Sequence, residues 1–225
     1  MPAADELSPV STPAMDEAAA APARKRPKPG ERRVQILQAL AAMLEQPGAE
    51  RVTTAALAAR LEVSEAALYR HFASKAQMFE GLIEFIEHTV FSLVNQIVVV
   101  RVESDAPAPN PGAGVAQAGR VLALLLQFAE KNPGMARVMV GDALVFENER
   151  LQQRMNQFFD RIESTLRQCL LPAAQAAGSN TPTVDAQVRA SALTAFAAGR
   201  LQRFTRSGFR RLPSEHLEAS LALML

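Results

Sequence analysis

The fold is decided by residues 51–75, RVTTAALAARLEVSEAALYRHFASK. Thr53 or Thr54 can cap a first short helix, whose apolar side chains Leu57, Ala58 and Leu61 recur at helical spacing. A turn at residues 61–63 follows, and Ser64 has the chemistry to cap a second helix. Two short helices joined by such a turn form a helix-turn-helix, whose second helix can lie in the major groove of DNA.

The outer face of this unit carries side chains that suit DNA binding. Small residues keep its leading edge slim enough for the groove, and donor side chains stand near helix ends, where phosphate oxygens are usually met. With few residues placed to reach base edges, DNA shape is expected to carry much of the sequence preference. The same donors, taken singly, would suit the surface of any helical hairpin. The candidate base contacts are Ser64, Glu65 and Ala66, and the candidate phosphate contacts are Thr53, Tyr69, His71 and Lys75.

The charge of the chain is unevenly distributed. Its formal net charge is only +1, but residues 24–75 hold ten bases against five acids. This excess of positive charge coincides with the helix-turn-helix, as expected for a small DNA-binding protein. A solvated basic face without a partner is the alternative interpretation.

Composition also bounds the location of the protein. The first residues lack the basic and apolar regions of a secretion signal, and Cys169 is the one cysteine, so no internal disulfide is possible. No apolar run approaches the roughly 20 residues that span a bilayer. We therefore expect no membrane span and a cytoplasmic location.

The run LYRHFASK, with the threonine-capped helix before it, resembles the DNA-binding head of the TetR family of all-helical dimeric regulators. The longer strings FAEKNPG and GDALVFENERLQQRMNQFFDRIE resemble those members that act in nucleoid occlusion, and the similarity extends from about Arg32 to about Pro213. The resemblance implies a TetR-like all-α fold, a homodimer, and palindromic sites on double-stranded DNA.

Three regions are expected along the chain. Residues 1–29 are rich in Ala and Pro and predict a disordered tail with a basic end, which either follows the DNA backbone or only aids solubility. Residues 30–75 predict the DNA-binding head, and residues 76–225 a helical body for partner binding and dimerisation. The first head helix, residues 31–46, should turn inward an apolar face made of Val34, Leu37, Leu40, Ala41 and Leu44.

A long helix is predicted from Ser74, its cap, to about Val100. Phe85 lies about 120° from the centre of its apolar seam, so it is either covered by another element or exposed to a partner. The periodicity favours the covered alternative, and the resemblance favours the exposed one. The seam residues are Phe79, Leu82, Ile83, Ile86, Val90, Leu93, Val94 and Ile97.

The rest of the body is expected to be helical with breaks at Pro and Gly. The predicted segments are a loop at 101–118, a helix at 120–131, a break at 132–134, a short helix to 146, a helix at 147–171 ended by Pro172, and helices at 184–207 and 214–225. Periodicity lets the last two helices pack within one chain or form half of a four-helix dimer interface, as in the family. The faces concerned hold Ala192, Ala195, Phe196 and Gly199 on one helix and Leu217, Leu221 and Met224 on the other.

Catalytic and metal-binding patterns are missing from the sequence. His71, His88 and His216 do not have the spacing of a metal site, and the chain holds neither a nucleophile elbow nor a phosphate loop with its lysine. We therefore expect no enzyme and no cofactor.

The resemblance implies a protein partner, the tubulin-like division protein FtsZ. DNA-bound family members of this kind antagonise FtsZ assembly over the nucleoid, and their partner groove corresponds to Phe85, Leu124, Lys131 and Asn132. The chain departs from the pattern where relatives carry arginine, at Leu93 and Lys131, and where they carry glycine, at Gln127. The alternative is a ligand-responsive repressor, but the mid-chain helices offer few polar groups to orient a ligand, so no small-molecule ligand is expected.

Overall fold

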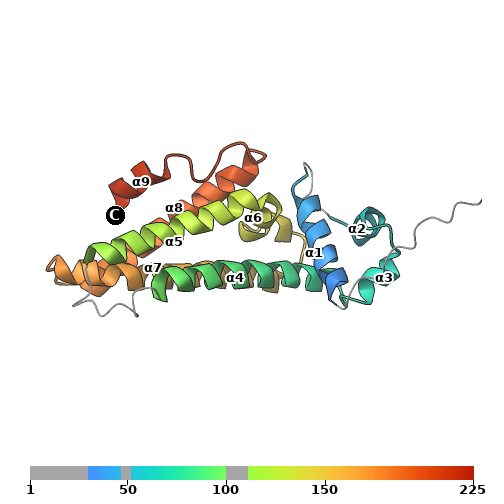
Figure 1. Ribbon diagram of the computed structural model, residues 1–225, viewed down its shortest axis with the longest axis horizontal. Helices are drawn as coiled ribbons and strands as arrows, with labels where there is room; N and C mark the ends of the chain where they lie inside the picture. The colour runs from blue at the N-terminus through green and yellow to red at the C-terminus, as the bar shows by residue number, and fades with distance from the viewer. Residues whose placement is uncertain (1–29, 47–51, 100–110) are drawn as a thin grey trace, which may run out of the picture.

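The structure, a computed structural model, describes residues 30–46, 52–99 and 111–225. Every regular element in these ranges is helical, which confirms the all-α prediction. Figure 1 shows an elongated body of long helices with a small head at one end, formed by α1 (Glu31–Leu44), α2 (Thr54–Arg60) and α3 (Glu65–Tyr69). The predicted tail and most of the predicted loop at 101–118 lie outside the described residues.

The buried face of α1 differs from the predicted one. Val34, expected inside, is 53% exposed, whereas Ile36 is completely buried beside Leu40, Ala41 and Leu44. The reason is that α1 packs against α2, α4 and α6 at once, so tertiary contacts set the buried face. The apolar stripe was predicted from the sequence of α1 alone, which carries no information on the helices that pack against it.

Helix α4 (Lys75–Val99) leads from the head into the body (Figure 1). Most of its predicted seam is buried, but Leu93 is 39% exposed, contrary to the prediction. Phe91 is buried in its place and packs its ring 5.3 Å from that of Phe158. Phe91 lies two positions before Leu93, and its large ring, which meets another ring, buries more area than the leucine does, so the buried face turns toward Phe91.

Helix α5 (Pro111–Lys131) begins well before residue 120, where the sequence placed it. Proline is favoured in the first turn because its ring presets the helical angle and its missing N–H would be unpaired there anyway. Gln117 and Ala118 are buried, and Gln117 Nε2 donates to the carbonyl oxygen of Ile97 at 3.3 Å. Packing on α4 thus overrides the weak helix propensity of the glycines.

The C-terminal body differs from the prediction in where its helices end. The break at Asn132 is confirmed, but α6 (Pro133–Met139) stops early and gives way to a 3₁₀ turn, η2 (Asp142–Leu144), after Gly141 at φ +83. Helix α7 (Glu149–Ala176) continues through Pro172, which was expected to end it. Cys169, Leu170 and Ala174 are buried on both sides of this proline. Their packing outweighs the lost backbone bond.

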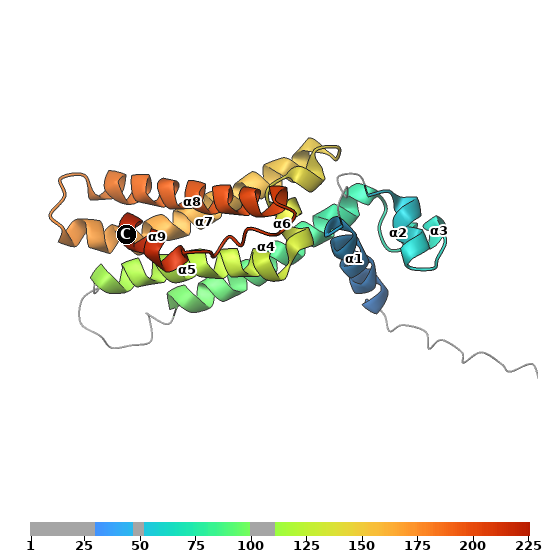
Figure 2. The ribbon, with the colours of Figure 1, turned by 90° about the horizontal axis from the view of Figure 1, so that it is seen from above.

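Helix α7 packs along both α5 and α8 (Pro182–Arg206), and Figure 2 shows these long helices side by side. The last helix, α9 (Leu217–Met224), lies against the core of its own chain, where Leu217 is buried. A β-carbon on Gly119 of α5 would lie 3.6 Å from Leu221. The α9 stripe that was considered for dimerisation is therefore largely used within the protomer. On α8, by contrast, Ala192, Ala195 and Gly199 are exposed and Phe196 is half-buried.

Helix α5 has the length and apolar composition of a membrane span over Gly112–Lys131, although the sequence was expected to hold no such segment. Half of that stretch is buried inside the protein. Val121, Leu122, Leu125 and Leu126 are fully covered by neighbouring helices. Its apolar character is thus explained by its place in the core.

Candidate nucleic-acid interface

Both helices of the helix-turn-helix are capped as their sequence predicts. Thr53 Oγ1 accepts a hydrogen bond from the backbone N–H of Ala56 at 3.1 Å, and Ser64 Oγ accepts from Ala67 at 3.3 Å. Each hydroxyl still has its own hydrogen to donate, and both side chains are exposed. The two caps therefore fix the helix starts and present donors at the same place.

The recognition helix α3 begins with two exposed residues, Glu65 and Ala66. The side chain of Glu65 is held in place by a hydrogen bond, because Thr54 Oγ1 donates to its Oε2 at 2.6 Å across the turn. The sequence indicates Thr54 only as a possible cap and does not reveal this role. Eleven residues separate the pair, and no local pattern indicates such a bond.

The end of α3 is anchored to α1. Arg33 stacks over the ring of buried Phe72 at 4.2 Å and donates to the carbonyl oxygen of His71 at 3.1 Å. Tyr69 and the side chain of His71 remain exposed. These two candidates thus lie on the same exposed head as Thr53, Ser64, Glu65 and Ala66, and all are available to a nucleic acid.

Lys75 is the candidate that the structure sets apart. Its Nζ donates to Glu147 Oε1 at 2.5 Å, and the two side chains are only 28% and 10% exposed. The ammonium group also lies 5.7 Å from the centre of the Phe79 ring. Its charge is thus paired with that of Glu147, 72 positions along the chain, whereas the other candidate side chains are exposed.

The family resemblance assigns four residues to a partner groove, and these are called the α4–α5 surface: Phe85 on α4, Leu124 and Lys131 on α5, and Asn132 directly after α5. Phe85 is 48% exposed, so the covered alternative favoured by periodicity is wrong for the protomer. Lys131 is exposed, and Leu124 and Asn132 are half-buried. Asn132 is held in place because its Nδ2 donates to the carbonyl oxygen of Phe128 at 2.7 Å. All three departures from the family pattern, Leu93, Gln127 and Lys131, are exposed.

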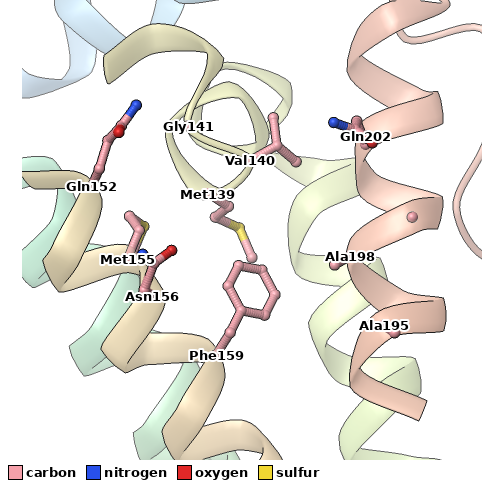
Figure 3. Close-up of a pocket in the computed structure, with 11 residues that line it drawn as sticks. Met139, Val140, Gly141, Gln152, Met155, Asn156, Phe159, Ala195, Ala198 and Gln202 are labelled. Carbon is pink, nitrogen blue, oxygen red and sulfur yellow. The ribbon is translucent and has the colours of Figure 1, made fainter. Parts of the chain in front are cut away.

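A pocket of about 620 Å³ lies between α6, α7 and α8. Figure 3 shows Met139 and Phe159 directed toward each other in this space. Three amide side chains, Gln152, Asn156 and Gln202, also line it. Among the described residues no group of His, Cys, Asp and Glu could hold a metal ion.

The head and the body each match a known family model. Residues 36–82 match bacterial regulatory proteins of the tetR family, and residues 114–225 match the tetracyclin repressor-like C-terminal domain of the SlmA-like type. The chain is 48% identical over 193 residues to the nucleoid occlusion factor SlmA of Idiomarina loihiensis, covering 86% of this chain and 93% of that protein. The chain belongs to the SlmA family.

Other SlmA proteins are equally similar. The Vibrio vulnificus protein is 50% identical over 198 residues, with 88% of this chain and 95% of that protein covered. The Vibrio cholerae protein is 49% identical over 194 residues, with 86% and 93% covered. SlmA proteins are named as nucleoid occlusion factors, and with the tetR-type head this identifies the chain as a DNA-binding protein of cell division. Proteins of this kind are not enzymes, in agreement with the prediction.

Solved structures of TetR-type regulators share the fold. PfmR of Thermus thermophilus superposes with a TM-score of 0.65 at 20% identity, covering 85% of this chain and 97% of that one. FadR of Bacillus subtilis, solved in complex with stearoyl-CoA, superposes with a TM-score of 0.61 at 13% identity, covering 85% and 96%. At such identities the likeness concerns the fold alone. It confirms the TetR-like arrangement of head and body.

Proposed function

We propose that the protein binds palindromic chromosomal sites as a homodimer and, when bound to DNA, antagonises FtsZ assembly over the nucleoid. In this proposal residues 30–75 read the DNA, and residues 76–225 dimerise and bind FtsZ. The protein works in the cytoplasm on the nucleoid. The family supplies this activity, and the exposure of Phe85 on α4 is the observation that carries it to this chain.

The DNA-binding half of the proposal rests on the exposed face of the head. Thr53, Ser64, Tyr69 and His71 present donors around the start and end of α3, where phosphates flank a helix in the major groove. Lys75 belongs to this set only if its bond to Glu147 opens. Because a dimer carries two heads, its site should be palindromic.

The dimer is supported by the outer face of α8. Val184 and Val188 are exposed on this helix, and Ala195 and Gly199 continue the same face at helical spacing. Small residues let two helices approach closely, and a symmetric dimer uses the same patch on both copies. A second copy would cover this face with its own α8 and the adjoining part of α7.

The FtsZ-binding half rests on the α4–α5 surface. The half-exposed Phe85 of α4 and the half-buried Leu124 of α5 each offer an apolar contact, and Lys131 adds a positive charge at the end of α5. An extended acidic-apolar segment of FtsZ would suit this combination. Lys131 keeps the charge of the family's arginine but loses its planar fork, and Leu93 removes a charge. The contacts at these two positions therefore differ from those of the family.

The test is an FtsZ assembly assay with site DNA, unrelated DNA and no DNA. Phe85→Ala should retain folding and DNA affinity and weaken the inhibition of FtsZ assembly at least about fivefold, which corresponds to roughly 1 kcal/mol of a contact. Leu223→Ala is the matched control, since Leu223 is 90% exposed on α9 and far along the chain. Intact inhibition by Phe85→Ala would exclude this surface.

A ligand-responsive repressor is the second candidate, because the pocket between α6, α7 and α8 combines apolar walls with three amide groups. A map of chromosomal occupancy separates the two functions. Many sites spread over the chromosome and away from promoters support nucleoid occlusion. A few sites at promoters support a local repressor.

A further inference from the structure

Glu65 places a carboxylate at the leading end of the recognition helix. It is the first residue of α3 and is exposed. A carboxylate that approaches DNA is repelled by the phosphates and by every hydrogen-bond acceptor on the base edges. Its presence in the groove is favourable only where it meets a donor. A glutamate at this position therefore acts by discriminating between bases more than by adding affinity.

The bond from Thr54 fixes where this carboxylate lies. Thr54 is the first residue of α2, is half-buried, and donates to Glu65 Oε2 at 2.6 Å. A β-branched side chain such as threonine has few χ1 rotamers, so the donor is itself well placed. An exposed glutamate without such a bond samples several rotamers and loses entropy when one is selected. The bond removes much of that loss before DNA arrives.

The bond also divides the two carboxylate oxygens between two tasks. Oε2 accepts from Thr54, and among the described residues no other donor to Glu65 is found. An ionised carboxylate offers only acceptors, so Oε1 is left to accept from an external donor. In the major groove such donors are the exocyclic amines of cytosine and adenine.

We infer that Thr54 is a positioning residue that holds Glu65 for a cytosine amine, so that each head selects cytosine at one position of its half-site. Cytosine suits the carboxylate better than adenine, because the adenine amine stands next to the acceptor N7. Guanine and thymine present acceptors where Glu65 needs a donor, so both are rejected. This inference rests on the DNA-binding half of the proposed function and is independent of FtsZ.

A merely structural role for the Thr54–Glu65 bond makes a different prediction. A strut between α2 and α3 would hold the angle of the two helices, and its loss would weaken binding to every DNA sequence alike. A positioning role changes the ratio of affinities between sequences. The ratio is therefore the quantity to measure.

The experiment uses the full chain and a library of random DNA duplexes, from which the preferred site is selected. Four duplexes that differ only at the selected cytosine, in both half-sites, then give affinities for each base. The unmodified protein should prefer cytosine over guanine and thymine by about tenfold or more. Thr54→Val, which replaces the hydroxyl with a methyl group, should reduce that ratio to about threefold or less. Thr54→Ser should restore it, and Glu65→Gln should move the preference to adenine.

Three results would overturn the inference. One is equal weakening of all four duplexes by Thr54→Val, and another is an unchanged cytosine preference in Glu65→Gln. The third is a selected site without any position that responds to Glu65. Failure of the unmodified protein to bind any selected duplex would instead remove the DNA-binding proposal itself, so the two failures are distinguishable.

Discussion

Gly134 and Ala41 are in such close contact that a β-carbon on Gly134 would lie only 2.0 Å from the carbonyl oxygen of Ala41. Gly134 stands in the first turn of α6, and Ala41 lies on α1 of the head. The head and the body therefore meet backbone to backbone at this point. Asn132, at the end of the α4–α5 surface, is two positions away. A displacement of α1 would therefore also displace the start of α6, directly next to the surface proposed to bind FtsZ.

Gly134→Ala should destabilise the protein by about 1–3 kcal/mol, because the new methyl group must displace backbone atoms of α1. Chemical denaturation measures the loss. Gly119→Ala is the control, since its β-carbon would make only an ordinary contact 3.6 Å from Leu221. Alanine in place of a helical glycine should there be neutral or stabilising by up to about 1 kcal/mol. Equal stability of the two variants would contradict the close contact.

Lys75→Gln should lower the stability of the fold and have little effect on the binding of DNA phosphates. Removing the ammonium leaves the mostly buried Glu147 carboxylate without its partner, at a cost of about 1–3 kcal/mol. Because Glu147 already neutralises Lys75, the slope of log affinity against log salt should change by clearly less than the roughly 0.9 expected for one phosphate contact.

The double variant Lys75→Gln/Glu147→Gln is the control for the ion pair and should recover most of the stability. DNA titrations at several salt concentrations give the slope. A slope lower by about one unit, with stability unchanged, would return Lys75 to the phosphate contacts.

Ala195→Glu should convert the proposed dimer into monomers. It places a charge on the exposed face of α8, where a second copy would bury it twice because the interface is symmetric. Analytical ultracentrifugation measures the mass, and binding to a palindromic site should weaken at least about tenfold, or 1.4 kcal/mol. Ala222→Glu makes the same change on an exposed position of α9 and should remain dimeric. A dimeric Ala195→Glu would exclude this face.

Arg154→Lys should lower stability by about 0.5–1 kcal/mol, because lysine lacks the planar fork that binds both oxygens of Glu87. Arg154 donates from Nε at 3.0 Å and from a terminal nitrogen at 2.6 Å, and these bonds join α7 to α4. The hydrogen bond to Glu87 raises the pKa of Arg154 above its ordinary value. A raised pKa on a cation means that its stabilisation holds at lower pH and is lost only when the pH passes that pKa.

The loss of stability in Arg154→Lys should therefore be constant between about pH 7 and pH 9, because neither arginine nor lysine loses its proton in this range. Thermal unfolding at several pH values checks this. A deficit that disappears within this range would show that the pair does not account for it.

Local signals in the sequence predicted the local structure well. Thr53 and Ser64 cap their helices as expected, because an N-cap depends only on residues two or three positions away. Pro111 was assigned to a loop and Pro172 to the end of a helix, but both lie in helices. Packing against neighbouring helices decides whether a helix continues, and this packing cannot be predicted from a local pattern. The exposure of Leu93 was missed for the same reason.

In the candidate sites, too, local features could be predicted from the sequence and long-range contacts could not. Periodicity placed Glu65 and Tyr69 on the outer face, where the structure has them. The partners of Lys75 and Glu65 could not be predicted, because the bonds cross 72 and 11 positions of the chain. The exposure of Phe85 was indicated by family resemblance alone.

The exposure of Leu93, Gln127 and Lys131 has a consequence for how the protein can change over time. Their side chains lie outside the core, whereas neighbours such as Val94 and Phe128 on the same helices are buried. Substitutions at the three exposed positions therefore leave the fold almost unaffected. When the sequence of a protein partner changes, substitutions at these three positions can compensate for the change. Binding is then kept while the individual contacts differ between species.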